Sequence, residues 1–291
     1  MNSSKPPQFS KGPVEIRRAL EVIERSVMGF DRITILVDHP APEISHRKIT
    51  QHCRKLEILD SNSQKYHPGW QTIIRLYQPT RRALIELQAQ LGPRCRTYVR
   101  YAELAFDLIT SGFRSSGIIH DFMLEHFRLP YVRQSVWFEK GTAYFARRAS
   151  SDGKKVGANF VIYSDKPSKL KRFRDKGQPC CHLEYRFQGV EMLAQHGLLT
   201  LSDCIDFDHQ AFWRDNLRLY MLPKKVELGR RLDPRGTQVS DTALTKRANT
   251  LLGRYRYGEA VVLQDLWREQ PLIAKLVKPI DNSLFIRGVT S

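Results

Sequence analysis

The sequence predicts an α+β fold, with a central, mainly antiparallel sheet, flanking helices and a small helical extension at the C-terminus. The middle of the chain is dense in short segments rich in β-branched and aromatic residues, which favour strands. Gly-rich or basic turns separate these segments, and helical patterns lie between them and after them. Strands that follow one another through short turns, with helices inserted, are typical of an α+β domain built on an antiparallel sheet.

The first third of the chain reads as helix, strand, strand and helix. Apolar residues at helical spacing predict the first helix, and Gly29 ends it. Thr80 is a natural N-cap for the second helix of this region, and Gly92 with Pro93 terminates that helix. The expected elements are a helix over 14–27, strands over 32–38 and 70–77, and a helix over 78–91.

The remainder of the chain alternates in the same way and ends in a helical pattern. We expect strands over 97–109, 142–148, 158–164 and 181–188, and helices over 115–126, 190–196, 212–222, 242–252 and 259–267. This gives a flexible arm over 1–13, a main domain over 14–233 and a helical extension over 241–291 after a polar, turn-rich linker. The final two helices either cap the main domain or form a DNA-reading helix pair.

The composition favours a nucleic-acid partner and argues against a membrane. The chain has 291 residues, and its 47 Lys and Arg against 30 Asp and Glu give a net charge of +17. A charge of this size indicates a polyanionic partner, such as nucleic acid. No apolar run approaches the roughly 20 residues of a membrane span, and the polar start lacks the apolar stretch of a signal peptide. The five cysteines are scattered and odd in number, which is typical of reduced thiols. We therefore expect a cytoplasmic protein with no membrane partner.

Two acids share one face of the predicted strand over 97–109. Side chains repeat every second residue on a strand, so Glu103 and Asp107 point the same way with the small Ala105 between them. Neighbouring carboxylates repel each other unless they share a cation, and Mg²⁺ or Mn²⁺ prefers such oxygen ligands. The alternative is an ordinary solvated strand face.

The predicted strand over 181–188 carries a second group of polar side chains. By the same alternation His182, Glu184 and Arg186 share one face, while Tyr185 takes the other. An imidazole and a carboxylate are candidate metal ligands, and a guanidinium can neutralise the charge of a phosphate. The alternative is a Glu–Arg pair on an exposed strand with a histidine nearby.

A tyrosine near the end of the strand over 158–164 precedes a strongly basic loop. Tyr163 is a candidate nucleophile, and Lys166 lies just after it. The alternative is a packed tyrosine with its hydroxyl in water. Like charges crowded into one loop are stabilised by a phosphate backbone. The candidate DNA-binding residues are Arg147, Arg148, Lys169, Lys171, Arg172, Arg174, Lys176 and Arg186.

The motifs at 101–107, 141–145, 162–166 and 182–186 resemble the core pattern of rolling-circle replication initiators. The similar proteins are the replication initiation factors of filamentous phages and of small plasmids, and the resemblance covers about residues 30–222. In that family a strand with the pattern T-x-Y-x-G leads to a Y-D-K strand and then to an R-x-E strand. This chain departs from the pattern at three positions, Ala146, an inserted Ser164, and His182 in place of the arginine.

The resemblance implies a metal-dependent enzyme that nicks and rejoins one DNA strand at a replication origin through a 5′-phosphotyrosine. It implies Tyr163 as nucleophile, with Tyr144 and Tyr185 as alternatives, and Lys166 as a neighbouring charge stabiliser. The metal candidates are Glu103, Asp107 and Glu184, to which His182 is added from its shared face with Glu184. Implied partners are single-stranded or hairpin origin DNA, a host helicase and the replication machinery of a bacterial cell. The alternatives are a non-catalytic DNA-binding regulator and a metal nuclease that activates water.

Overall fold

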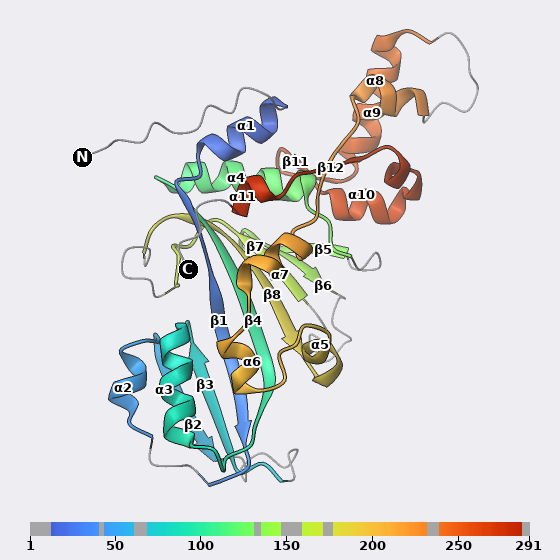
Figure 1. Ribbon diagram of the computed structural model, residues 1–291. Helices are drawn as coiled ribbons and strands as arrows, with labels where there is room; N and C mark the ends of the chain where they lie inside the picture. Colours follow the sequence, from blue (N-terminus) through green and yellow to red (C-terminus); the bar gives the residue numbers. More distant parts are fainter. Residues whose placement is uncertain are drawn as a thin grey trace.

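The computed structural model describes residues 13–40, 44–60, 69–130, 135–146, 159–170, 177–231 and 239–286. Its centre is an eight-stranded sheet in the order β2-β3-β1-β4-β8-β7-β6-β5, and every neighbouring pair of strands in it is antiparallel (Figure 1). The strands are β1 (Arg25–Val37), β2 (Lys55–Asp60), β3 (Thr72–Tyr77), β4 (Thr97–Ile109), β5 (Ser135–Glu139), β6 (Thr142–Ala146), β7 (Asn159–Tyr163) and β8 (Cys180–Gln188). The predicted α+β fold with an antiparallel sheet is confirmed.

The two longest strands, β1 and β4, lie side by side at the centre of the sheet and sort their side chains by alternation. Leu104, Phe106 and Leu108 of β4 are fully buried in the main hydrophobic core. Glu103 and Asp107 point to the opposite face, as the sequence predicted. The sheet therefore has one apolar face and one face that carries acidic groups.

Helices cover the apolar face and contribute to its core. In Figure 1 α6 and α7 lie in front of the central strands, and Trp213 of α7 packs with its ring centroid 5.2 Å from that of Phe106. These helices are α1 (Val14–Glu21), α2 (His46–Thr50), α3 (Arg81–Leu91), α4 (Phe113–His126), α5 (Val190–Gln195), α6 (Leu201–Ile205) and α7 (His209–Asn216). Thr80 caps α3 by accepting a hydrogen bond from the backbone N–H of Ala83, as expected.

The C-terminal part of the chain has its own small hydrophobic cluster, which includes Leu228, Ala248 and Leu266. Strand β9 (Leu219–Met221), whose Leu219 belongs to the main core, precedes this part. The elements that follow are α8 (Lys225–Arg231), α9 (Asp241–Gly253), β10 (Arg256–Tyr257), β11 (Ala260–Val261), α10 (Leu263–Glu269), a 3₁₀ helix (Pro271–Lys275), β12 (Lys278–Ile280) and α11 (Ser283–Ile286). The chain then returns to the main domain, because β12 pairs with β9 and Phe285 joins the main core.

Three of the predicted helices are wrong in their bounds. The helix over 14–27 ends at Glu21, because the chain from Arg25 onward pairs with β4. The helix over 212–222 ends at Asn216, because the residues of β9 pair with β12. The helix over 259–267 begins at Leu263, after the β10–β11 hairpin. In each case pairing with a distant or neighbouring strand overrides a helical pattern.

The sequence also predicted reduced cysteines and no membrane-spanning segment. The five cysteines are free thiols, and four of them are buried. No helix in the described ranges is long and apolar enough to cross a membrane.

Candidate functional site

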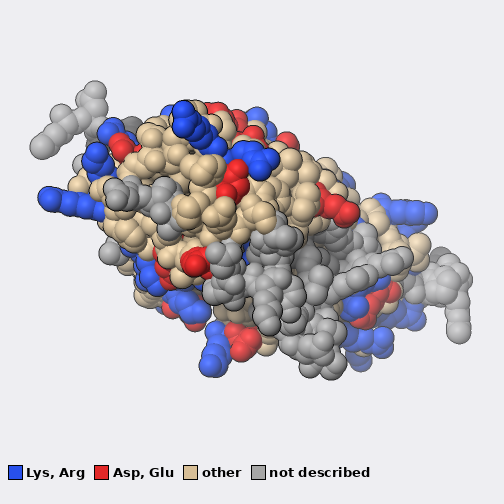
Figure 2. Space-filling model, turned by 90° about the horizontal axis from the view of Figure 1, so that it is seen from below, with Lys and Arg blue, Asp and Glu red and all other residues tan. Residues whose placement is uncertain are grey.

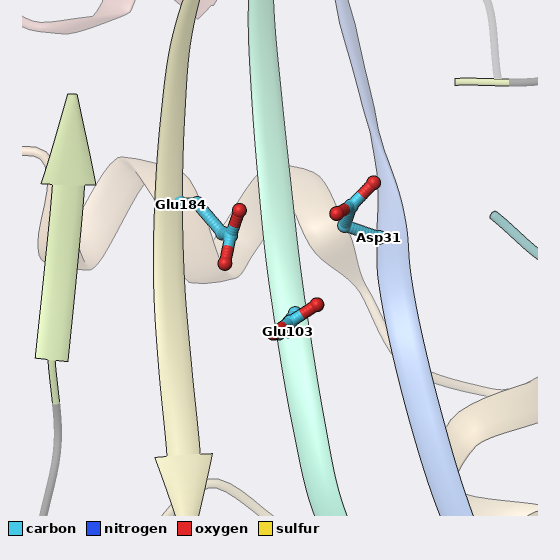
Figure 3. Close-up of side chains that lie close together, drawn as sticks. All are labelled: Asp31, Glu103 and Glu184. Atoms are coloured by element: carbon cyan, nitrogen blue, oxygen red, sulfur yellow. The ribbon is translucent and has the colours of Figure 1, made fainter. Parts of the chain in front are cut away.

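Three buried carboxylates from three neighbouring strands meet on the face of the sheet opposite α6 and α7. Asp31 lies on β1, Glu103 on β4 and Glu184 on β8 (Figure 3). One carboxylate oxygen of each lies within 4.8 Å of the others, and the three residues are only 8%, 6% and 2% exposed. Like charges this close raise the free energy of the folded state unless a cation or a proton compensates them. These three residues are hereafter called the acidic cluster.

A β-bulge places Asp31 in the acidic cluster. In the pairing of β1 with β4, Phe30 lies opposite Leu104 and Arg32 lies opposite Glu103, so Asp31 is an extra residue on β1. A bulge interrupts strict alternation. Two consecutive side chains, Asp31 and Arg32, can therefore reach Glu103 and its surroundings on one face.

Gln78 fixes the position of Asp31. Its backbone N–H donates to the Asp31 carbonyl oxygen at 2.9 Å, and its side-chain Nε2 donates to the Asp31 carboxylate. Gln78 has a φ of 44°, a left-handed conformation that is unfavourable for a residue other than glycine. Burial raises the pKa of Asp31 above its usual value. No Lys, Arg or His in the described ranges forms an ion pair with Asp31, which leaves its charge the least compensated of the three.

Glu103 contacts two arginines and one tyrosine hydroxyl. Its Oε1 accepts from Arg32 Nη2 at 2.7 Å and from the Tyr101 hydroxyl at 2.5 Å, and Arg186 Nε lies 3.7 Å away. Burial nevertheless raises the pKa of Glu103 to about 7, and the negative charge of Glu184 adds to this effect against the opposing arginines. Near neutral pH, Glu103 is therefore the member of the acidic cluster that readily exchanges a proton.

Beside the acidic cluster, a buried histidine bridges two carboxylates. His182 places Nδ1 at 2.5 Å from Asp107 Oδ1 and Nε2 at 3.1 Å from Glu184 Oε2. Burial alone would lower the pKa of His182, but the two carboxylates outweigh it and raise the pKa to about 10. Burial would likewise raise the pKa of Glu184, but His182 and Arg186 lower it to about 2. His182 is thus a buried imidazolium at neutral pH rather than a general base.

Tyr163 lies on the same face as the acidic cluster, in the cross-strand row that contains His182 and Asp107. Its ring stacks on the His182 ring with centroids 4.4 Å apart. The Lys166 and Lys169 ammonium groups lie 5.1 and 5.7 Å from the Tyr163 ring centroid. Tyr163 is only 5% exposed, and burial together with the nearby carboxylates raises the pKa of its phenol. The phenol is therefore neutral in this conformation.

The structure brings Glu103 and Glu184 together as predicted, but the third acid beside them is Asp31 rather than Asp107. Glu103 and Glu184 converge with Asp31, whereas the carboxylate of Asp107 contacts His182 and the hydroxyl of Ser168. The alternative of a solvated strand face is wrong, because Glu103, Asp107, His182 and Glu184 are all buried. Tyr185 faces the core as predicted, with its ring centroid 5.5 Å from that of Trp213.

The predicted DNA-binding residues are only partly described. Arg186 is held by Glu184 and Glu103, inside the polar network. Lys169 lies beside the Tyr163 ring. The others lie outside the described residues: Arg147, Arg148, Lys171, Arg172, Arg174 and Lys176. On the face shown in Figure 2, the described Lys and Arg side chains are spread out rather than gathered into one patch.

Sequence reasoning missed Asp31. The predicted strand began at Arg32, so Asp31 fell into a turn after the expected helix. The continued run of β-compatible residues before it, from 25 onward, is the signal that could have extended the strand. The bulge itself leaves no mark in the spacing of the acids.

The donor set of the acidic cluster fits a hard divalent cation. Three buried carboxylates that converge from a rigid sheet offer the oxygen ligands that Mg²⁺ and Mn²⁺ prefer. No model of a known protein family matches the chain, and no curated protein matches it either.

Proposed function

We propose that this protein is a metal-dependent enzyme that nicks and rejoins one DNA strand, of the type that initiates rolling-circle replication in a bacterial cytoplasm. The observation that carries the proposal is the acidic cluster, with Tyr163 on the same face of the sheet. The net charge of +17 supports DNA as the partner. A non-catalytic DNA-binding regulator would have no use for three converging buried acids.

Asp31, Glu103 and Glu184 would hold Mg²⁺ or Mn²⁺. When bound, the ion polarises the scissile phosphate and offsets the charge that develops on it. His182 compensates the charges of Asp107 and Glu184 and holds the Tyr163 ring by stacking. Lys166 and Lys169 place positive charge beside the phenol, where it stabilises the phenolate as it forms.

The reaction balances without any other reactant. The Tyr163 hydroxyl oxygen attacks phosphorus, a tyrosine O–P bond forms, and the bond from phosphorus to the 3′-oxygen breaks. In net terms the phenol proton goes to the 3′-oxygen, which leaves as a 3′-hydroxyl. Reversal by another 3′-hydroxyl rejoins a strand, because the phosphotyrosine bond conserves the energy of the broken one.

The burial of Tyr163 has a consequence for this reaction. The segment after β7 packs over the acidic face: Leu170 contacts the cluster of Val27 and Ala105, and Ser168 donates to Asp107. This cover must open before a phosphate reaches the hydroxyl. The same burial favours a second candidate, a nuclease that uses the acidic cluster to activate water and leaves Tyr163 as a packed residue.

Trapping a protein–DNA adduct tests the proposal. The purified protein is incubated with Mn²⁺ and a pool of single-stranded oligonucleotides of randomised sequence that carry a label at the 3′ end. A 5′-phosphotyrosine leaves the labelled part on the protein, so a labelled band should migrate with the chain on a denaturing gel. We expect the wild type to give this band and Tyr163→Phe to lose it.

Two matched variants and one treatment complete the experiment. Tyr144→Phe and Tyr185→Phe remove the alternative hydroxyls and should leave the band unchanged. Excess chelator should abolish it. Labelled fragments without a band would support the water-activating nuclease, and a band that persists in Tyr163→Phe would refute Tyr163 as nucleophile.

A further inference from the structure

A cavity of about 280 Å³ shares a wall with the acidic cluster. It lies where β3 has ended and β1 continues alone on that side, because β3 pairs with β1 only from Arg32 onward. Met28 and Phe30 of β1 form one wall, the start of α3 forms a second, and the α6–α7 connection forms a third. Gln78 lines the cavity and also donates to the Asp31 carboxylate, so a ligand here sits one side chain away from the acidic cluster.

Three of the residues that line the cavity carry planar aromatic rings. Phe30, Phe207 and His209 all line the cavity. The ring centroids of Phe30 and His209 are 4.6 Å apart, and those of Phe207 and His209 are 5.0 Å apart, both in edge-on arrangements. Aromatic walls of this kind stack bases of single-stranded nucleic acid without regard to sequence.

Gln78 and Arg81 supply polar contacts for the rest of a nucleotide. Gln78 Oε1 is buried and has no hydrogen-bond partner in the structure, so it can accept from an N–H group on the edge of a base. Gln78 itself is only 4% exposed. The Arg81 side chain is 65% exposed; its Nε donates to the Ile205 carbonyl oxygen and its Nη2 lies 3.4 Å from Asp206. A phosphate outside the cavity can contact the remaining N–H groups of the guanidinium.

The size of the cavity limits the occupant. Cavities for drug-sized ligands measure roughly 300–1,000 Å³, so this one suits a single base or nucleoside. Enzymes that do chemistry on a DNA base take that unstacked base into a pocket and read it by stacking and by hydrogen bonds to its edge, which shows what such a pocket can bind.

We propose that this cavity binds one base of the DNA strand whose phosphate is cut at the acidic cluster, with Phe30, Phe207 and His209 as the stacking wall and Gln78 as the hydrogen-bond acceptor. The cavity lies on the α6–α7 side of β1 and the acidic cluster lies on the other side. The DNA strand therefore passes around the edge of β1 that β3 leaves free, beside Gln78, and the bound base positions the scissile phosphate. This inference rests on the proposed function, because the strand it describes is the one that is cut.

Photo-crosslinking tests the inference without requiring cleavage. The protein is mixed in chelator with single-stranded oligonucleotides of randomised sequence that contain 5-iododeoxyuridine, irradiated, digested and analysed by mass spectrometry. We expect crosslinks in the peptides that contain Phe30 or residues 205–210. Crosslinks confined to other peptides would overturn the inference.

Variants at the cavity and a matched control sharpen the result. Gln210 is exposed on the cavity rim, and Gln210→Trp should block the cavity, remove these crosslinks and weaken oligonucleotide binding about tenfold. Gln195→Trp changes another exposed glutamine, which lies on α5 and does not line the cavity, and this variant should behave as wild type. Phe207→Leu removes one stacking ring with less bulk and should reduce the crosslinks even if Gln210→Trp folds poorly. Unchanged crosslinks and binding in both cavity variants would refute the proposal.

The outcome is distinguishable from that of the adduct experiment. Cleavage in Mn²⁺ without crosslinks at the cavity would leave the proposed function standing and refute the base site. Crosslinks at the cavity without cleavage in Mn²⁺ would support the base site as a DNA-binding feature and refute the nicking activity.

Discussion

Replacing Asp31 by asparagine should stabilise the metal-free protein while it weakens metal binding. Two unit charges 4.8 Å apart interact by about 3.5 kcal/mol at an effective dielectric constant of 20. Attraction to His182 and Lys169 opposes this repulsion, so we expect a net gain of about 1 kcal/mol when the charge is removed. Asparagine keeps an oxygen for the Gln78 amide, so the hydrogen bond can persist. For a chain of this size the gain corresponds to a rise in Tm of about 2–4 °C.

The assay compares thermal unfolding in chelator and in Mn²⁺ near pH 8, about one unit above the pKa of Glu103. Mn²⁺ at about 100 times its Kd should stabilise the wild type by about 2.7 kcal/mol. The variant has lost one of three carboxylate ligands and should gain much less. The order of stability therefore reverses between the two conditions, with Asp31→Asn higher in chelator and lower in Mn²⁺.

Asp206→Asn is the matched control, because Asp206 is 70% exposed and contacts only Arg81 at 3.4 Å among the ion pairs of the described residues. It should change neither the metal-free Tm nor the Mn²⁺ increment by a measurable amount. The reasoning is refuted if Asp31→Asn unfolds at a lower temperature than wild type in chelator and shows the full Mn²⁺ increment.

Three further outcomes follow from the structure. Because a proton on Glu103, whose pKa is raised to about 7, competes with the cation, Mn²⁺ affinity measured by calorimetry should fall about tenfold per unit as pH drops below that value and level off above it. His182→Gln leaves two buried carboxylates without their shared cation and should lower the free energy of unfolding in urea by about 3–5 kcal/mol. A Cβ at Gly229 would lie 2.2 Å from the Leu244 carbonyl oxygen, so Gly229→Ala should separate α8 from α9 and speed proteolysis there, while the conservative exposed change Lys246→Arg should not.

The faces of the strands could be predicted because alternation is a local property. Two-residue periodicity correctly placed Glu103 with Asp107, and His182 with Glu184 and Arg186, without knowledge of the neighbouring strands. Burial could not be predicted in the same way. Whether a polar strand face meets water or protein depends on segments far along the chain, such as the one that carries Ser168 and Leu170.

Asp31 shows where sequence reasoning fails. Residues 14–27 have apolar residues at helical spacing, but the helix ends at Glu21 and pairing with β4 makes the last three residues of that stretch, 25–27, part of a strand. The bulge then decides which face Asp31 takes, since a shift of one residue sends a strand side chain to the opposite side. The start of the strand and the face that Asp31 takes both depend on pairing with β4, which lies more than sixty residues further along the chain.

Asp31 is also where the features that cost free energy coincide. Arg32, Arg186 and His182 compensate Glu103, Glu184 and Asp107, as expected for an ion network that only supports the fold. Asp31 has only the Gln78 amide as a side-chain partner among the described residues, and that glutamine adopts a left-handed φ. A bulge, a residue with a strained backbone and the least compensated charge of the acidic cluster coincide at one point, and such features commonly coincide at functional sites. Because the same glutamine lines the cavity, the cation and the base would be held by adjoining groups, and loss of either should impair placement of the same phosphate.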